Sequence, residues 1–259
     1  MSLRTEVVGL DRLDDIRRSW IEMLPHGRWA FFMHPDWCGT AWAAFAPRAT
    51  VHLHLAYEGN ELVGILPVCH RRMNKFGLFM PVAEALAGAR GDYTLPVLRQ
   101  DAPEHTIPLL LDSALKSARS AGALLVANAP DETGVPARVE QHLHEQGLAF
   151  RRTQAQCMLL TFPQGAASAD AVLPSRRRND VKRQMKRVQE EVGPLAFRVA
   201  TSPDEAVSLL PAFFEMHDRR WLEAGYPGSF GSAAARDYYH QFVRRLWDAG
   251  VHFSVTTCG

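Results

Sequence analysis

Cysteine, long apolar runs and an excess of charge of either sign are all scarce in this sequence. Its 259 residues include only four cysteines, and no two of them form a C-x-x-C pair. This spacing excludes the common zinc motifs and a small disulfide framework, so a reducing cytoplasm is the expected location. No apolar run approaches the ~20 residues that a membrane span needs, and the first twenty residues lack the apolar core of a signal peptide. The sequence therefore predicts a soluble protein.

The charge is balanced overall and concentrated in one place. There are 29 Lys and Arg against 28 Asp and Glu, which gives a formal net charge of +1. A protein with this balance is not expected to bind polyanions over its whole surface. The stretch LPSRRRNDVKRQMKRV, residues 173–188, differs because seven of its residues are basic and only Asp180 is acidic.

The order of predicted elements is typical of an α/β fold with a mixed sheet. Helices are expected over residues 10–24, from Asp36 onward, and over 104–121, 135–146, 203–223 and 233–249. LAYEGNELVGILPV, residues 55–68, predicts a hairpin that turns at Gly59-Asn60. Further extended segments are expected at 148–152 and 156–162. The first predicted element is the helix that begins at residue 10.

A small, turn-prone segment predicts a boundary between two units. PQGAASADA begins at Pro163, so we expect a linker over 163–172 between a first domain at 1–162 and a second at 173–259. In the second unit the order strand, helix, helix, strand repeats the opening of the first. Its last strand has an unpaired edge, like one arm of a hairpin, so this unit is expected to be incomplete at the C-terminus.

Five segments carry a resemblance to a known family: HPDWCGTAW, LAYEGNELVGILPV, GDYTLPVL, LPSRRRNDVKRQMKRV and FFEMHDRRWLEAG. Together with the order of elements, they resemble the GNAT acyltransferase superfamily. Two such units in tandem are similar to the CelD/BcsL-type acetyltransferases and, more distantly, to the Fem-type aminoacyl transferases. The resemblance implies tandem GNAT-like units with mixed, partly antiparallel sheets. It also implies transfer of an acyl group from acetyl-CoA, or another acyl-CoA, to the amine or hydroxyl of a sugar- or peptide-like acceptor.

The glycine-rich turn that holds the pyrophosphate of CoA in this family is not found. In the first unit it would fall on LRQDAPEHTI, residues 98–107, which contains no glycine and carries Asp101 and Glu104. In the second unit the equivalent turn would lie beyond residue 259. We therefore expect the chain as given to bind acetyl-CoA weakly or not at all. The alternative function is a non-catalytic binding or assembly module for an anionic saccharide or a protein partner.

The basic segment predicts an amphipathic helix with Ser175 at its N-cap. An apolar stripe is expected to be buried and consists of Val181, Met185, Val188 and Val192. Arg178, Lys182 and Lys186 form one basic row beside it. Two interpretations stay open for this row, a solvated face and a rim for an anionic acceptor or cofactor. Nucleic acid is not expected as a partner, because no aromatic residues alternate with the charges.

Few other residues are candidates for a site. Tyr93 could supply a proton to a leaving thiolate and Asp92 could take one from an amine, or the pair is simply a turn with a half-buried ring. Arg220 is the preferred anion clamp of the long helix, where Trp221 is expected to be a core anchor. His52 and His54 share one face of a strand, but no third ligand accompanies them and no metal site is predicted. The catalytic residues and the oligomeric state are otherwise left open.

Overall fold

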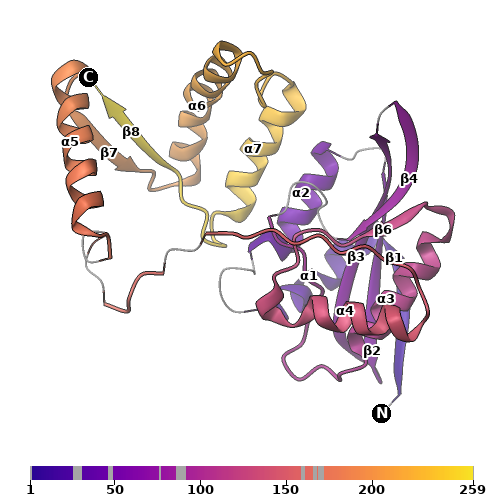
Figure 1. Cartoon of the computed structure of the whole chain (residues 1–259). Helices are drawn as coiled ribbons and strands as arrows, with labels where there is room; N and C mark the ends of the chain where they lie inside the picture. The colour runs from indigo at the N-terminus through magenta and orange to yellow at the C-terminus, as the bar shows by residue number, and fades with distance from the viewer. Residues whose placement is uncertain are drawn as a thin grey trace. The chain divides into compact units, whose positions relative to one another are not determined.

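The first half of the chain is built around a mixed sheet (Figure 1). The computed structural model describes residues 2–25, 31–45, 49–75, 77–85, 92–158, 161–165, 168 and 172–258. The strands of the sheet are β1 (Leu3–Gly9), β2 (Thr50–Glu58), β3 (Glu61–Lys75), β4 (Leu78–Ala85), β5 (Val97–Leu98) and β6 (Ala123–Leu125). They follow the order β1-β2-β3-β4-β6, with β5 beside β3. Strands β1 to β4 pair antiparallel and β6 is parallel to β4, which confirms the predicted α/β fold with a partly antiparallel sheet.

The hairpin predicted at Gly59-Asn60 is present and sets the register of the sheet. Gly59 has a φ of +61°, a left-handed conformation that glycine adopts without steric cost, and Glu58 pairs with Glu61 across the turn. Alternate side chains of β2 then point to opposite faces. Leu53 and Leu55 face one side and His54 the other, and all three are buried. Both faces of the sheet are therefore covered.

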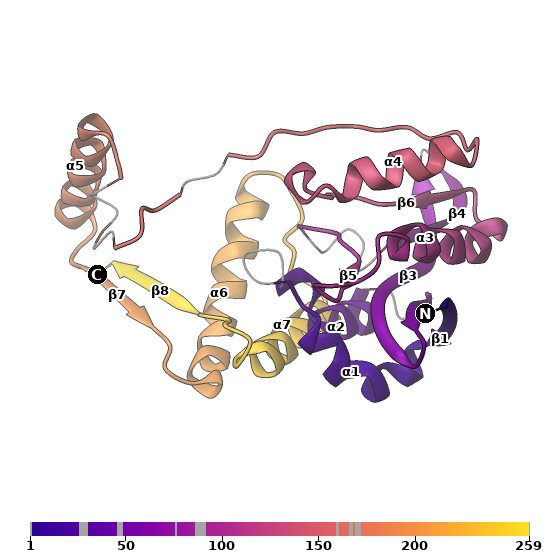
Figure 2. The ribbon, with the colours of Figure 1, turned by 90° about the horizontal axis from the view of Figure 1, so that it is seen from below.

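The helices of the chain are α1 (Leu13–Glu22), α2 (Pro35–Phe45), α3 (Thr106–Ser117), α4 (Val135–Glu145), α5 (Ser175–Glu191), α6 (Pro203–Glu223) and α7 (Ala233–Leu246). They match the predicted helices to within a few residues. In Figure 2, α1 and α2 lie on one side of the sheet and α3 and α4 on the other. Helix α3 lies close to β3, since a Cβ added at Gly64 would be 2.7 Å from Thr106 Cγ2 and 3.1 Å from Leu110 Cδ1.

Strand β1 is an element that sequence reasoning missed. The predicted first element was the helix at residue 10, yet Leu3–Gly9 forms a strand that pairs with β2 from Leu3↔Glu58 to Gly9↔His52. As an edge strand, β1 is exposed over most of its length, so it lacks the apolar alternation of a half-buried strand. The extended segments expected at 148–152 and 156–162 are also wrong as strands for the part that is described, because residues 147–158 contain none.

Helices α6 and α7 belong, by packing, largely to the first unit. The chain divides into one compact unit of Met1–Ala149 with Val207–Val251 and another of Phe150–Ala206 with His252–Gly259. Phe242 of α7 packs against Trp37 of α2, with ring centroids 5.1 Å apart. These compact units differ from the predicted ranges 1–162 and 173–259. Half of the predicted linker at 163–172 lies outside the described residues, and that division stays a prediction.

The second unit contains α5 and a two-stranded antiparallel sheet of β7 (Leu195–Val199) and β8 (Ser254–Cys258). Helix α6 begins here as predicted, because Ser202 Oγ accepts a hydrogen bond from Glu205 N at 3.1 Å. The order β7-α6-α7-β8, with its outer strands antiparallel, is also the order of β1-α1-α2-β2. The predicted echo between the two halves is therefore present in the connectivity.

Candidate functional site

A groove between α6 and α7 is a concave site among the described residues. Its volume is ≈ 670 Å³, which falls within the range of small-molecule sites. The groove is lined by Pro211, Phe214, Glu215, Asp218, Arg219, Leu222, Glu223, Arg236 and His240. Residues of α6 at intervals of three and four line one wall, and Arg236 and His240, one turn apart on α7, line the other.

Aromatic rings form the floor of this groove. Phe214 is only 3% exposed, and its ring centroid lies 4.6 Å from that of Phe230 and 5.9 Å from that of His240. Tyr239 also packs against Phe230, at 5.0 Å. Because these rings pack against one another, they form a rigid base beneath the polar side chains of the groove.

The loop that joins the two helices is held by specific hydrogen bonds. Asp218 Oδ1 accepts a hydrogen bond from Phe230 N at 3.0 Å, and Arg236 Nε donates to Phe230 O at 2.7 Å. Ser232 caps α7, because its Oγ accepts from Ala235 N at 3.2 Å. Gly228 is required for this closure, since a Cβ there would lie 2.1 Å from Asp218 Oδ1. The loop therefore fixes one carboxylate and one guanidinium of the groove.

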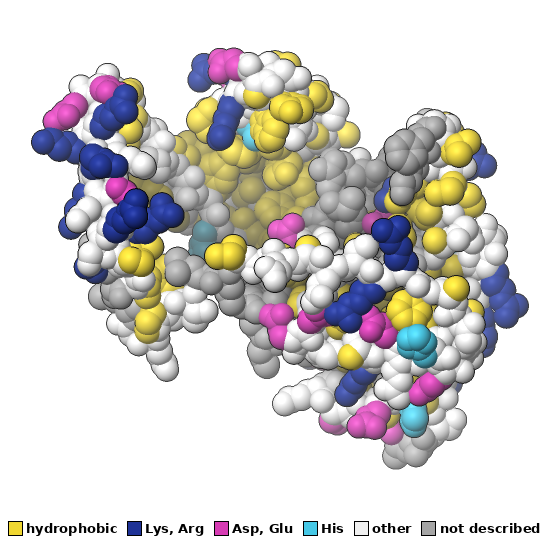
Figure 3. All heavy atoms as spheres, in the orientation of Figure 1, with side chains coloured by type: hydrophobic (Ala, Val, Ile, Leu, Met, Phe, Trp, Pro, Cys, Tyr) yellow, Lys and Arg dark blue, Asp and Glu magenta, His cyan; other side chains and the backbone are white. Residues whose placement is uncertain are grey.

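The other charged residues of the groove are uncommitted. Glu215, Arg219 and Glu223 follow one another at one-turn intervals on α6 and are exposed, and none of them forms an ion pair with a described residue. Figure 3 shows acidic and basic side chains next to hydrophobic ones over this region. Free carboxylates can accept hydrogen bonds from an ammonium group, and the imidazole of His240 can accept a proton. The groove therefore suits a polar ligand that carries an amine.

Sequence reasoning located this helix but chose a different arginine. Arg220 is exposed and is not among the lining residues, whereas its neighbour Arg219 is. The role predicted for Arg220 stays a prediction. Trp221, expected to be a core anchor, is 43% exposed and packs against Tyr226 at a centroid distance of 5.8 Å. The core-anchor prediction was wrong, because Trp221 lies in the last turn of α6, where Tyr226 of the loop covers only part of its ring.

The apolar stripe of α5 is exposed, which corrects the prediction that it is buried. The exposed fractions are 45% for Val181, 48% for Met185, 37% for Val188 and 63% for Val192. In the described part of the second unit α5 is accompanied by the two-stranded β7–β8 sheet, whose Phe197 and Val199 are also exposed. Basic side chains gather over α5 in Figure 3.

Several cations of α5 are paired within the helix. Lys186 Nζ lies 3.6 Å from Glu190 Oε1, and Arg178 donates a hydrogen bond to Ser175 Oγ at 3.0 Å. Lys182 is exposed. One-turn ion pairs of this kind are common on a solvated helix face and are worth a few tenths of a kcal/mol. The substrate-binding role predicted for Arg178, Lys182 and Lys186 stays a prediction.

Asp92 and Tyr93 lie in the first unit and are not among the lining residues of the groove. Asp92 is exposed, and the ring of Tyr93 packs edge-on against Phe32 at 5.6 Å. The weak catalytic roles predicted for this pair stay predictions.

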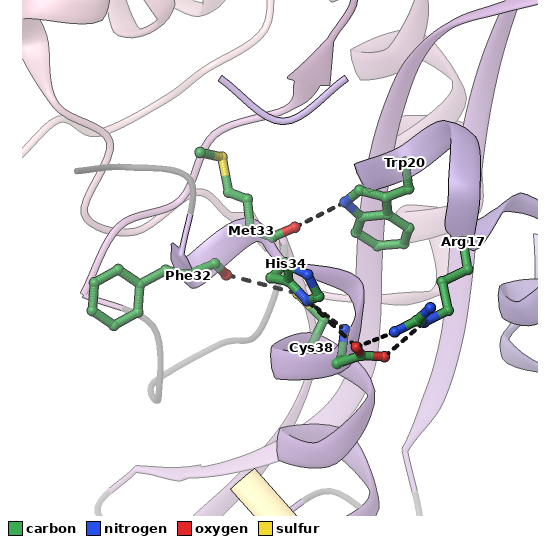
Figure 4. Close-up of polar contacts among 7 residues, drawn as sticks. Arg17, Trp20, Phe32, Met33, His34 and Cys38 are labelled. Atoms are coloured by element: carbon green, nitrogen blue, oxygen red, sulfur yellow. Dashed lines mark hydrogen bonds and ion pairs between the residues drawn. The ribbon is translucent and has the colours of Figure 1, made fainter. Parts of the chain in front are cut away.

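A junction between α1 and α2 contains polar contacts that the sequence did not reveal (Figure 4). Arg17 Nε donates to Asp36 Oδ1 at 2.9 Å, and Trp20 Nε1 donates to Met33 O at 2.8 Å. Burial lowers the pKa of His34, although Asp36 opposes that shift. Burial also raises the pKa of the Cys38 thiol, so this cysteine stays protonated and is a poor nucleophile. The junction therefore has a structural role, which is to fix α1 against α2.

A buried histidine fastens α3 to the sheet. His54 Nδ1 lies 2.8 Å from Ser113 Oγ and its Nε2 lies 3.2 Å from Ser117 Oγ. Burial, with smaller contributions from His52 and His70, lowers the pKa of His54 to about 4. Across the described ranges there is no group of three His, Cys, Asp or Glu residues arranged to hold a metal ion. The His54 ring thus acts as a neutral cross-link between β2 and α3.

The turn between β5 and α3, where the CoA pyrophosphate was expected, carries the wrong charges for it. Arg99 is bound by three carboxylates, with Nη1 2.6 Å from Glu61 Oε2 and Nη2 3.4 Å from Glu58 Oε2, and Asp101 accepting from Nε. The hydrogen bond to Asp101 raises the pKa of Arg99 further. The positive charge of Arg99 is therefore already balanced by these carboxylates, and Glu104 adds a further negative charge to the turn. The residues present do not fit a pyrophosphate group.

Comparisons with known proteins give a family match over part of the chain and several similar solved structures. Residues 175–259, from the first residue of α5, match the family described as acetyltransferase (GNAT) domain. A comparison with curated proteins found no match. Similar solved structures include a ribosomal-protein-alanine N-acetyltransferase from Brucella melitensis biovar Abortus 2308, which is 17% identical over 62% of this chain and 100% of that chain, with a TM-score of 0.36.

Two further similar structures are also acetyltransferases. The glucosamine-6-phosphate N-acetyltransferase from Arabidopsis thaliana is 7% identical over 61% of this chain and 99% of that one, with a TM-score of 0.39. An aminoglycoside N-acetyltransferase in complex with CoA is 13% identical over 62% of this chain and 95% of that one, with a TM-score of 0.37. At these identities and TM-scores the structures are similar to this chain and no more. The matched residues, 175–259, include both helices of the groove.

Proposed function

We propose that this chain belongs to a GNAT-type acyltransferase of the cytoplasm and that the α6–α7 groove holds the acceptor. The reaction is the transfer of an acyl group from acyl-CoA to the amine or hydroxyl of a sugar- or peptide-like molecule. The observation that carries the proposal is the match of residues 175–259 to the acetyltransferase (GNAT) domain, because the whole groove lies inside that segment.

The groove residues supply the acceptor side of this reaction. Glu215 and Glu223 accept hydrogen bonds from the ammonium group of the acceptor. One of its protons then passes to a ring nitrogen of His240, which leaves a lone pair on the acceptor nitrogen. Arg219, between the two glutamates, binds a hydroxyl or an anionic group next to the amine. The turn between β5 and α3 is given no role in binding the cofactor, because its charges do not suit a pyrophosphate.

The tandem arrangement of the CelD/BcsL type is part of the proposal. It is supported by the shared connectivity of β1-α1-α2-β2 and β7-α6-α7-β8. In the first unit, β2 pairs with β1 on one edge and β3 on the other. In the second unit β8 pairs only with β7 among the described strands.

The experiment that tests the function measures release of the CoA thiol from acetyl-CoA with glucosamine as acceptor. Acetyl-CoA is supplied well above the low-micromolar range, because the chain is expected to bind it weakly. We expect release that depends on glucosamine and that falls at least tenfold in Glu215→Gln. The control is Glu145→Gln on α4, outside the groove, which should leave the rate unchanged.

The second candidate function is the non-catalytic binding module, which is favoured by the poor fit of the turn near Arg99 and Asp101. Glucosamine binding without any acceptor-dependent thiol release would support that module and would contradict the acyltransferase.

A further inference from the structure

The hairpin of β3 and β4 extends past the rest of the sheet. The pairing of β2 with β3 ends at His70, and β6 pairs with β4 only at Val82–Glu84. The pairs Met73↔Met80, Asn74↔Phe79 and Lys75↔Leu78 therefore have no third strand beside them among the described residues. We call residues 72–75 and 77–80 the β3–β4 arm. At about 3.4 Å per residue it is roughly 14 Å long, and the end of β4 projects from the sheet in Figure 1.

The arm exposes apolar side chains on both of its faces. Leu78 is 69% exposed, Phe79 is 67% exposed and Met80 is 43% exposed. Successive residues of a strand point to opposite faces, so neither face of the arm is polar along β4. Hydrophobic side chains gather around the end of β4 in Figure 3. A two-stranded ribbon is marginal in water, and a contiguous apolar patch on such a ribbon indicates a surface that meets a partner.

The charge of the arm identifies the partner. Residues 72–80, which span the arm, contain two basic residues, Arg72 and Lys75, and no acidic residue. The nearest carboxylate on β4 is Glu84, whose side chain is only 5% exposed and whose Oε2 accepts from Arg71 Nε at 2.7 Å. Arg72 is exposed. The arm therefore combines a positive charge with an apolar tip.

We propose that the β3–β4 arm docks on the surface of an anionic lipid bilayer. Leu78, Phe79 and Met80 enter the interfacial region, and the positive charge of the arm is attracted to the lipid phosphates. Apolar side chains together with flanking cations are what a peripheral protein needs for such a surface. A second copy of the chain suits the arm less well, because two positively charged arms would repel each other. This docking is peripheral, since none of the helices in the described part of the chain has the length and apolar character of a membrane span.

Co-sedimentation of the full chain with vesicles tests the proposal. We expect binding to mixed phosphatidylcholine–phosphatidylglycerol vesicles at least tenfold stronger than to pure phosphatidylcholine, and weaker binding as salt is raised. Leu78→Ser with Phe79→Ser should lower the partition coefficient at least tenfold. Arg72→Glu should lower it about fivefold or more. Leu148→Ser and Arg138→Glu, matched exposed positions outside the arm, should leave it unchanged.

Three results would overturn the proposal. The first is a lack of binding to the anionic vesicles, and the second is unchanged binding in the Leu78→Ser, Phe79→Ser protein. The third is a dimer, seen by sedimentation velocity, that dissociates in the same double variant while vesicles do not bind. Circular dichroism of each variant checks that the fold is retained, which is expected because the substituted side chains are exposed.

Discussion

At the residue scale, one glycine decides whether the loop between α6 and α7 can close. Gly228→Ala would place a Cβ 2.1 Å from Asp218 Oδ1 and so displace the carboxylate that accepts from Phe230 N. We expect this variant to lose roughly 1–3 kcal/mol of unfolding free energy, as in other overpacked sites. Urea denaturation of the full chain measures the loss.

The matched control is three residues further along the same loop. A Cβ added at Gly231 meets nothing within 4 Å, so Gly231→Ala should change the unfolding free energy by less than about 0.5 kcal/mol. Equal effects of Gly228→Ala and Gly231→Ala would show that the Asp218 contact does not hold the loop.

His54 makes stability depend on pH. Its pKa is lowered to about 4, below the ordinary value of 6.5, because burial disfavours the charged ring. The unfolded chain therefore binds more protons between these two values, and the unfolding free energy should fall as pH drops from about 6.5 to about 4, by up to about 3 kcal/mol. Urea denaturation measured at several pH values across this window should show a weaker dependence of the unfolding free energy on pH in His54→Gln. An unchanged pH slope in that variant would assign the effect to other groups.

Single residues also show where sequence reasoning ended. The helical spacing of α6 could be read from the sequence, but which of Arg219 and Arg220 lines the groove could not. Adjacent residues differ by 100° around a helix, and the direction of the groove is fixed by α7, which is distant in sequence. The role of Gly228 likewise depends on a carboxylate ten residues away in the chain.

At the element scale, the elements with a clear periodic spacing of apolar residues were predicted, and the exposed edge strand β1 was not. Helices α3, α4, α6 and α7 and the hairpin at Gly59 followed from apolar spacing, caps and turn residues. Strand β1 was missed because an edge strand has little apolar alternation. For α5 the predicted helix is present, but the prediction that its apolar stripe is buried was wrong. An amphipathic pattern shows which face is apolar, but not whether another element covers it.

The exposure of the α5 stripe can be measured directly. Met185 is 48% exposed, so Met185→Gln should change the unfolding free energy by less than about 0.5 kcal/mol. Leu210 of α6 is 1% exposed, and Leu210→Ala should cost about 2–5 kcal/mol. Chemical denaturation of both variants compares the two positions. A loss above about 2 kcal/mol in Met185→Gln would mean that the stripe is covered.

At the scale of the whole molecule, the mixed α/β sheet was predicted from the sequence, and so was the lack of a glycine-rich turn between β5 and α3. The lack of glycine between β5 and α3 could be read directly from the sequence. The ion pairs of Arg99 with Glu58 and Glu61 could not be predicted, because those residues lie about forty positions earlier and meet Arg99 only through the β2–β3 hairpin. The groove was beyond prediction for the same reason, since two helices and a folded loop create it.

The central claim is that the α6–α7 groove binds an amine-bearing acceptor through Glu215 and Glu223. Isothermal titration of the full chain with glucosamine, with N-acetylglucosamine as the matched ligand without an ammonium group, tests it most directly. We predict binding of glucosamine, at least tenfold weaker binding of N-acetylglucosamine, and at least a tenfold loss of glucosamine affinity in Glu215→Gln with Glu223→Gln. Equal affinity for both sugars, or full affinity in the double variant, would contradict the claim.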